Sequence, residues 1–286
     1  MNKIDFFGGA HGNFLELVID TFVNQHDYDF NQPVFNSNGA CHLKDHNPNY
    51  APDIKAKHWS TWNIPFDPQD QVIEIHVEPE WMLALLVNSF MRAGLETIDI
   101  TDLENHTLKK LYDIDKARPF VEDLIQEHGE HEHYPRSVIR NYFYSKFNDP
   151  VNGIDQFNQF QFKGKSHIFP FSAFFDLDQF YFHLNQCAYF LNQDFIARPE
   201  CASLWKQFLE LNQGYASQLR CNQIIEDILL GNSTSMPDLT LIEEAWINYR
   251  ISAIFRCYDH PLLTNDVYPT NTKQISDAIY LWKSQQ

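Results

Sequence analysis

The sequence predicts a three-layer α/β fold, in which helices cover a parallel sheet and the last third of the chain is helical. Strand-like apolar runs alternate with segments whose apolar residues recur at helical spacing. The first strand passes through a glycine-rich turn directly into the first helix. No repeat or low-complexity linker divides the 286 residues. We therefore expect one domain, with a sheet-containing core at residues 1–195 and a helical extension packed on it at residues 196–286.

Two strand–turn–helix pairs are predicted in the first hundred residues. Asn2–Phe7 is a short β-type run, and the glycine turn after it leads to a helix that Asn13 is placed to cap. Gln71–Val77 is rich in β-branched residues and predicts a second strand. The helix that follows, Trp81–Arg92, is apolar nearly all round, which is typical of a buried helix.

The remaining elements continue this alternation. Ser166–Phe171 predicts a third strand, and Asp176–Asn192 predicts a strongly amphipathic helix. Short strands at Pro33–Phe35 and His58–Trp62 are also candidates. Further helices are expected at Pro199–Gln213, Ser217–Leu230, Leu239–Arg256 and Thr272–Lys283.

The acidic composition excludes two classes of partner. The chain carries 21 Lys and Arg against 38 Asp and Glu, which gives a formal net charge of −17. Such a charge repels nucleic acid and anionic membranes, so we expect neither as a partner. No apolar run approaches the roughly 20 residues that span a bilayer, and no secretory leader is visible. The five cysteines are scattered without a CxxC pair, which predicts reduced thiols and a cytoplasmic location.

The first glycine turn is the leading candidate site. Gly8, Gly9, Gly12 and Asn13 place backbone N–H groups at a helix N-terminus, where an anion is favoured. In open parallel sheets, ligands gather at the carboxyl ends of the strands, where this turn must lie. His11, inside the turn, is a candidate hydrogen-bond donor or acid–base group. The alternative is a tight connection that needs glycine for its backbone angles, with His11 bonded to the backbone.

Arginines elsewhere are candidates for binding phosphate. Arg136 and Arg140 stand one helical turn apart and are placed to clamp a phosphate, unless they pair with the many carboxylates nearby. Ser89 and Arg92 are placed to reach a ligand at the first turn, or they simply end a helix. The His and Glu residues of His128–His133 suggest a metal, but such runs are usually solvated loops, and we expect no metal site.

Three segments, in this order, resemble the P-loop-type fold of sulfotransferases, and more closely the divergent sulfotransferase-like proteins of marine bacteria and their phages. They are KIDFFGGAHGNFLELVIDTF, QVIEIHVEPEWMLALLVNSFMRAG and HIFPFSAFFDLDQFYFHLNQCAYFL. The resemblance implies a P-loop-like first strand–loop–helix that binds the nucleotide phosphoadenylyl sulfate. It also implies transfer of a sulfuryl group to a hydroxyl or amine of a small-molecule or saccharide acceptor.

The same resemblance implies roles for individual residues. The Gly8–Asn13 loop would hold the 5′-phosphosulfate, with Gly12 at the family's glycine and His11 as base or donor. Ser89 falls near the serine expected in the second segment. Arg92, Arg136 and Arg140 would supply positive charge to the donor phosphates.

Two other functions stay open. Ala10 stands where the family has a lysine or arginine, and Asn13 where it has Ser or Thr. Together with the charge of −17, these substitutions favour a catalytically inert derivative that binds a ligand or partner through the same cleft. A metal-dependent hydrolase using His128–His133 is the third possibility.

Overall fold

The fold is taken from a computed structural model, which describes residues 2–7, 10–28, 34–35, 41, 53–58, 69–92, 126, 154, 162, 164–230 and 239–257. The chain divides into two compact units. The first comprises Met1–Ser89 and Pro150–Tyr215, and the second comprises Phe90–Asp149 and Ala216–Gln286. The single domain over residues 1–286 stays a prediction.

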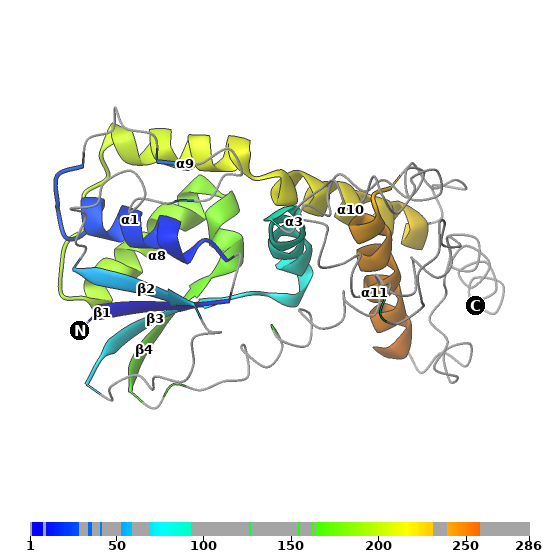
Figure 1. Ribbon diagram of the computed structural model, residues 1–286, viewed down its shortest axis with the longest axis horizontal. Coiled ribbons are helices and arrows are strands. Elements are labelled where there is room, and N and C mark those ends of the chain that lie inside the picture. Colours follow the sequence, from blue (N-terminus) through cyan, green and yellow to red (C-terminus); the bar gives the residue numbers. More distant parts are fainter. Residues whose placement is uncertain are drawn as a thin grey trace. The chain divides into compact units, whose positions relative to one another are not determined.

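The first unit contains a parallel sheet of four described strands, in the order β2-β1-β3-β4 (Figure 1). The strands are β1 (Asn2–Phe6), β2 (Ile54–His58), β3 (Gln71–His76) and β4 (Lys165–Pro170). The register places Ile4 of the central strand β1 opposite Ala56 of β2 and Ile73 of β3. The α/β class with a parallel sheet, predicted from the alternation of elements, is confirmed.

Helices and short 3₁₀ turns follow three of these strands. They are α1 (Gly12–Phe22), η2 (Pro79–Trp81), α3 (Met82–Arg92), η3 (Phe171–Phe175), α8 (Leu177–Phe190) and α9 (Pro199–Leu211). Helix α1 packs on β1 and β2, α8 packs on β4, and the two helices contact each other on the same side of the sheet (Figure 1). Helices on the second face of the sheet stay a prediction.

Local sequence signals explain where several helices begin. The Asp176 carboxylate accepts a hydrogen bond from the Gln179 N–H at 2.9 Å, which caps α8. Pro199 opens α9 at the first helical position, where its missing N–H costs no hydrogen bond.

Helix α10 (Gln213–Leu230) begins so close to α3 that a Cβ on Gly214 would overlap the Ala84 carbonyl oxygen.

Helix α1 is enclosed on all sides. Every residue of α1 except Asn13 is buried, and this includes two carboxylates. Glu16 accepts a hydrogen bond from the Ala56 N–H, and Asp20 accepts one from the Asp53 N–H at 3.0 Å. These buried carboxylates therefore link α1 to β2 and to Asp53, the residue before β2. They do so by satisfying backbone donors that would otherwise lack partners.

The second unit contains most of α10 and all of α11 (Leu241–Cys257). Thr240 and Glu243 form a reciprocal capping pair at the start of α11, because each accepts a hydrogen bond from the other's N–H, at 3.3 and 3.0 Å. Arg220 of α10 lies 3.3 Å from the Glu243 carboxylate. Both predicted helices are confirmed, whereas Thr272–Lys283 lies outside the described residues and a helical last third stays a prediction.

Among the helices described, none combines the length and the apolar character that crossing a membrane requires.

Candidate functional site

The turn between β1 and α1 is tight, and its last residue has left-handed backbone angles. The Ala10 N–H donates to the Phe7 carbonyl at 2.9 Å. His11 follows with φ 58° and ψ 25° as the residue that precedes α1. Its carbonyl accepts the Phe14 and Leu15 N–H groups at 3.0 and 3.1 Å, so the helix begins at Gly12.

The start of α1 corrects one sequence expectation. Asn13 does not cap the helix, because it lies inside the first turn as the second helical residue. Its side-chain Nδ2 donates instead to the Cys41 carbonyl at 3.4 Å. The sequence placed the helix start too late because His11, not an Asn or Ser, takes the position before it.

Gly12 has a packing role that is independent of any ligand. A Cβ at this position would overlap the ring of Phe6, the last residue of β1. The close approach of strand and helix therefore requires glycine here. Gly8 and Gly9 lie outside the described residues.

The turn lies beside the point where the sheet reverses its winding. From β1 the order runs to β2 on one side and to β3 on the other, and ligands bind at the carboxyl ends of strands at such a point. Glu78 follows β3 at this edge. Its carboxylate accepts the backbone N–H of Ser172 at 3.1 Å and the Ser172 hydroxyl, so it holds the start of η3.

The His11 ring is packed among aromatic side chains. It stacks on Phe171 with a centroid distance of 5.6 Å and an interplanar angle of 5°. Phe208 meets it edge-on at 4.7 Å, and Phe174 does so at 5.6 Å. The half-buried imidazole therefore packs between η3 and α9.

Asn212 determines which nitrogen of His11 carries the proton. The Asn212 Oδ1 accepts the Tyr215 N–H at 3.1 Å, which fixes the orientation of the carboxamide. Its Nδ2 then donates to Nε2 of His11 at 3.0 Å. Because Nε2 faces this donor, the arrangement favours the tautomer of His11 with its proton on Nδ1.

Three further rings lie at the carboxyl edge. Trp81 stacks on Phe175 at 4.9 Å, and Phe175 stacks on Tyr215 at 5.1 Å. Trp81 and Tyr215 are half-buried, whereas Phe175 is buried. This edge therefore offers flat, partly accessible apolar faces.

Three cysteines in the described part of the chain are not nucleophilic at neutral pH. Cys41, Cys187, Cys201 and Cys221 are buried and form no disulfide. Burial raises the pKa of the Cys201 thiol to about 12, and it raises the pKa of the Cys187 and Cys221 thiols further. These thiols stay protonated at neutral pH, and the thiolate is the reactive form.

The structure brings together part of the predicted site. His11, Gly12 and Asn13 lie side by side at the turn. Ser89 and Arg92 lie in the last turn of α3, where side chains are not among those described. Outside the described residues lie Arg136, Arg140 and His128–His133.

Sequence reasoning missed Asn212 and the aromatic rings at this edge. The run Phe171–Phe175, with three phenylalanines in five residues after a strand, was a signal for the rings. Asn212 gave no signal, because it stands 201 positions from His11.

A hollow lies at the opposite, amino-terminal edge of the sheet, where Gln71 and Lys165 begin β3 and β4. No protein-family model, curated protein or solved structure matches the chain.

Proposed function

We propose that the chain is a ligand- or partner-binding domain, a derivative of the parallel α/β fold that does not transfer sulfuryl groups. One observation carries the proposal. The His11 ring, the acid–base candidate of the turn, packs between Phe171 and Phe208 and accepts a hydrogen bond from Asn212. A general base must reach the acceptor's proton, and Nε2 of this half-buried ring is already hydrogen-bonded to Asn212.

Charge and burial at the same edge support this proposal. Glu78 places a carboxylate at the same edge of the sheet, where sulfuryl transfer would need positive charge around the donor phosphates. Ala10 stands where sulfotransferases have a lysine or arginine, and its side chain is 0% exposed. A basic side chain at that position would have to be accommodated within the core.

The accessible rings at the carboxyl edge support a binding role. Trp81 and Tyr215 present half-buried aromatic faces within one stacked group. Aromatic residues of this kind supply much of the binding energy at protein and ligand interfaces. A partner would insert an apolar or planar group against them.

A sulfotransferase is the second candidate, and the position of the turn favours it. His11 and Gly12 lie at the carboxyl end of β1, beside the reversal of the sheet, as in nucleotide-binding α/β folds. In the reaction, the bond between sulfur and the bridging phosphate oxygen breaks, and a bond from sulfur to the acceptor oxygen or nitrogen forms. The acceptor proton passes to a base, and the leaving adenosine bisphosphate keeps the electron pair.

Thermal unfolding with adenosine 3′,5′-bisphosphate, ATP and inorganic phosphate separates the two candidates. The binding-domain proposal predicts no selective stabilisation by the bisphosphate. A bound ligand at 100 times its dissociation constant would stabilise the protein by about 2.7 kcal/mol, which is readily measured. A selective rise in Tm with the bisphosphate would show that the chain binds the nucleotide, and sulfuryl transfer from phosphoadenylyl sulfate to an acceptor would then overturn the proposal.

A matched pair of variants locates any such stabilisation. Asn13→Asp adds a carboxylate at the start of α1, where a phosphosulfate would lie, and Asn185→Asp makes the same change on the exposed side of α8. Stabilisation that only Asn13→Asp abolishes would place the nucleotide at the turn. Restoring the family's basic residue by Ala10→Lys is a poorer test, because burial of an ammonium group would itself destabilise the fold.

A further inference from the structure

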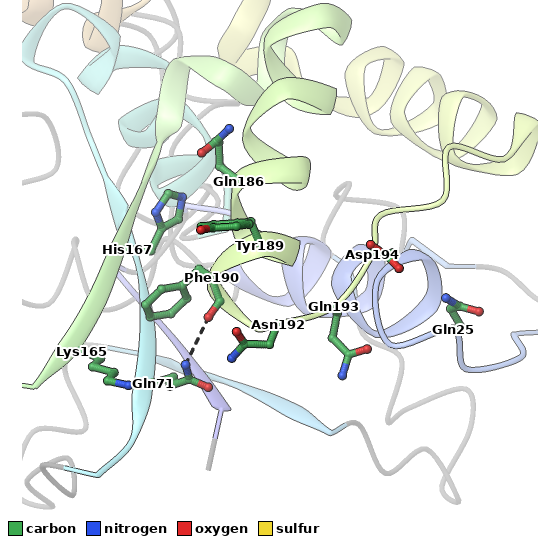
Figure 2. Close-up of a pocket in the computed structure, with 10 residues that line it drawn as sticks. All are labelled: Gln25, Gln71, Lys165, His167, Gln186, Tyr189, Phe190, Asn192, Gln193 and Asp194. Atoms are coloured by element: carbon green, nitrogen blue, oxygen red, sulfur yellow. Dashed lines mark hydrogen bonds between the residues drawn. The ribbon is translucent and has the colours of Figure 1, made fainter.

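A hollow of about 720 Å³ opens at the amino-terminal edge of the sheet (Figure 2). Its walls are the first residues of β3 and β4, the last turn of α8 and the segment that follows α8. The β1–α1 turn lies at the other end of the strands. An inference about this hollow is therefore independent of the function proposed for the turn.

Side-chain carboxamides dominate the lining. They belong to Gln25, Gln71, Gln186, Asn192 and Gln193. Gln71 donates from Nε2 to the Phe190 carbonyl at 3.2 Å, which leaves its Oε1 as an acceptor (Figure 2). The other four carboxamides have no hydrogen-bond partner among the described residues. Each carboxamide offers both donors and an acceptor, as does a pair of neighbouring hydroxyl groups.

An aromatic face accompanies the carboxamides. Tyr189 of α8 lines the hollow with its side chain 83% exposed, so its ring is not part of the core. His167 of β4 also lines the hollow and stacks on Phe190 at 5.6 Å. Its Nε2 is buried, with no hydrogen-bond partner in the described part of the chain. A ligand here would meet one flat ring and several unsatisfied polar groups.

The charges around the hollow disfavour an anion. Helices α1 and α8 both end at this edge, and the left-handed residues Gln25 (φ 61°) and Asn192 (φ 57°) follow their last turns. Helix C-termini carry partial negative charge. Lys165 and Asp194, the charged residues of the lining if His167 is neutral, offset each other. The hollow therefore suits an uncharged ligand with many hydroxyl groups better than a phosphate or sulfate.

We propose that this amino-edge hollow binds a neutral saccharide, with a sugar ring stacked on Tyr189 and its hydroxyl groups hydrogen-bonded to the surrounding carboxamides. The lining suits a sugar because it combines an exposed aromatic face with donors and acceptors in nearly equal supply. Apolar ligands are poorly matched, because most pockets for such molecules have mainly apolar walls.

Isothermal titration of the full chain with cellohexaose, maltohexaose and chitohexaose tests the proposal. We expect saturable binding to at least one of them with a dissociation constant on the order of 1 mM. Tyr189→Ala should weaken this binding about two- to tenfold, because it removes the stacking face. Phe182→Ala is the matched control, since Phe182 is an exposed aromatic residue of α8 outside the lining, and it should leave the affinity unchanged.

Gln186→Ala is a second variant that removes one carboxamide and leaves Tyr189 in place; we expect it to weaken binding as well. Absence of saturable binding to all three hexasaccharides would overturn the proposal. So would binding that neither Tyr189→Ala nor Gln186→Ala weakens, because the sugar would then lie elsewhere. Adenosine 3′,5′-bisphosphate should not compete with the sugar, whatever its own affinity at the turn.

Discussion

His11 combines a left-handed backbone conformation with a packed side chain, a combination that the sequence could not show. Its backbone occupies the left-handed region, and its ring packs on Phe171 and Phe208. The left-handed conformation costs most residues about 1–2 kcal/mol, and Asn tolerates it better than most. The ring must offset that cost by its packing and by the hydrogen bond to Asn212.

We expect His11→Asn to lower the free energy of unfolding by about 1–3 kcal/mol, because the ring packing and the Asn212 hydrogen bond are lost while the backbone stays tolerated. Urea denaturation measures this change. An unchanged or higher stability would contradict the packing role and would favour a catalytic one.

Gly12→Ala has two opposing effects of known size on stability. Alanine gains about 1 kcal/mol over glycine from helix propensity, but overpacking against the Phe6 ring costs about 1–3 kcal/mol. We expect the overlap to prevail and the urea midpoint to fall. A rise in the midpoint would show that Phe6 moves aside freely and that close packing does not require glycine.

At the scale of elements, periodicity predicted most of what the structure shows. The strand at Gln71–Val77 and the helix at Asp176–Asn192 match β3 and α8 to within two residues at each end. Strand β2 was harder to predict, because lysines alternate through Ile54–His58, and the predicted strand begins at His58, where β2 ends. Local patterns reveal local elements but not the long-range pairing that recruits a polar segment into a sheet.

Only those parts of the candidate site that neighbouring residues form were predictable. The turn with His11 and Gly12 follows from glycine spacing, whereas the bond from Asn212 to His11 depends on how α9 returns to the turn. The buried carboxylates Glu16 and Asp20 were also missed, since their burial depends on backbone donors of a distant strand and the residue before it.

Two histidines on β4 and α8 make stability depend on pH. Burial lowers the pKa of His167, and nearby His183 lowers it further. Burial also lowers the pKa of His183, which Glu78 opposes in part. Both folded-state pKa values lie below the unfolded value of about 6.5, so protonation favours unfolding. Their contribution is complete above about pH 6.5 and is lost as the pH falls through the folded-state values.

Urea denaturation between about pH 7.5 and pH 5 should therefore show a falling free energy of unfolding. The double variant His167→Gln and His183→Gln should flatten this slope, and each single variant should do so in part. An equal slope in the double variant would assign the pH dependence to other groups.

At the scale of the whole molecule, the net charge of −17 produces long-range electrostatic repulsion. Like charges repel in the compact state, and salt screens them, because the Debye length falls from about 30 Å at ~0.01 M to about 3 Å at ~1 M. We expect the urea midpoint to rise with NaCl over this range. Sucrose at matched osmolality is the control for effects other than screening, and a midpoint that falls with NaCl would mean that attractive ion pairs dominate.

The strand register also sets how fast the first unit can assemble. Asn2 pairs with Ile54 and with Gln71, and Gln71 pairs with Lys165, a separation of 94 positions. Pairings this distant in sequence close long loops before ladder hydrogen bonds form, which slows folding relative to proteins built from local contacts. Helix α1 becomes buried only when that sheet and α8 are in place. During this interval its apolar side chains face water, and newly made chains are most exposed to association with one another.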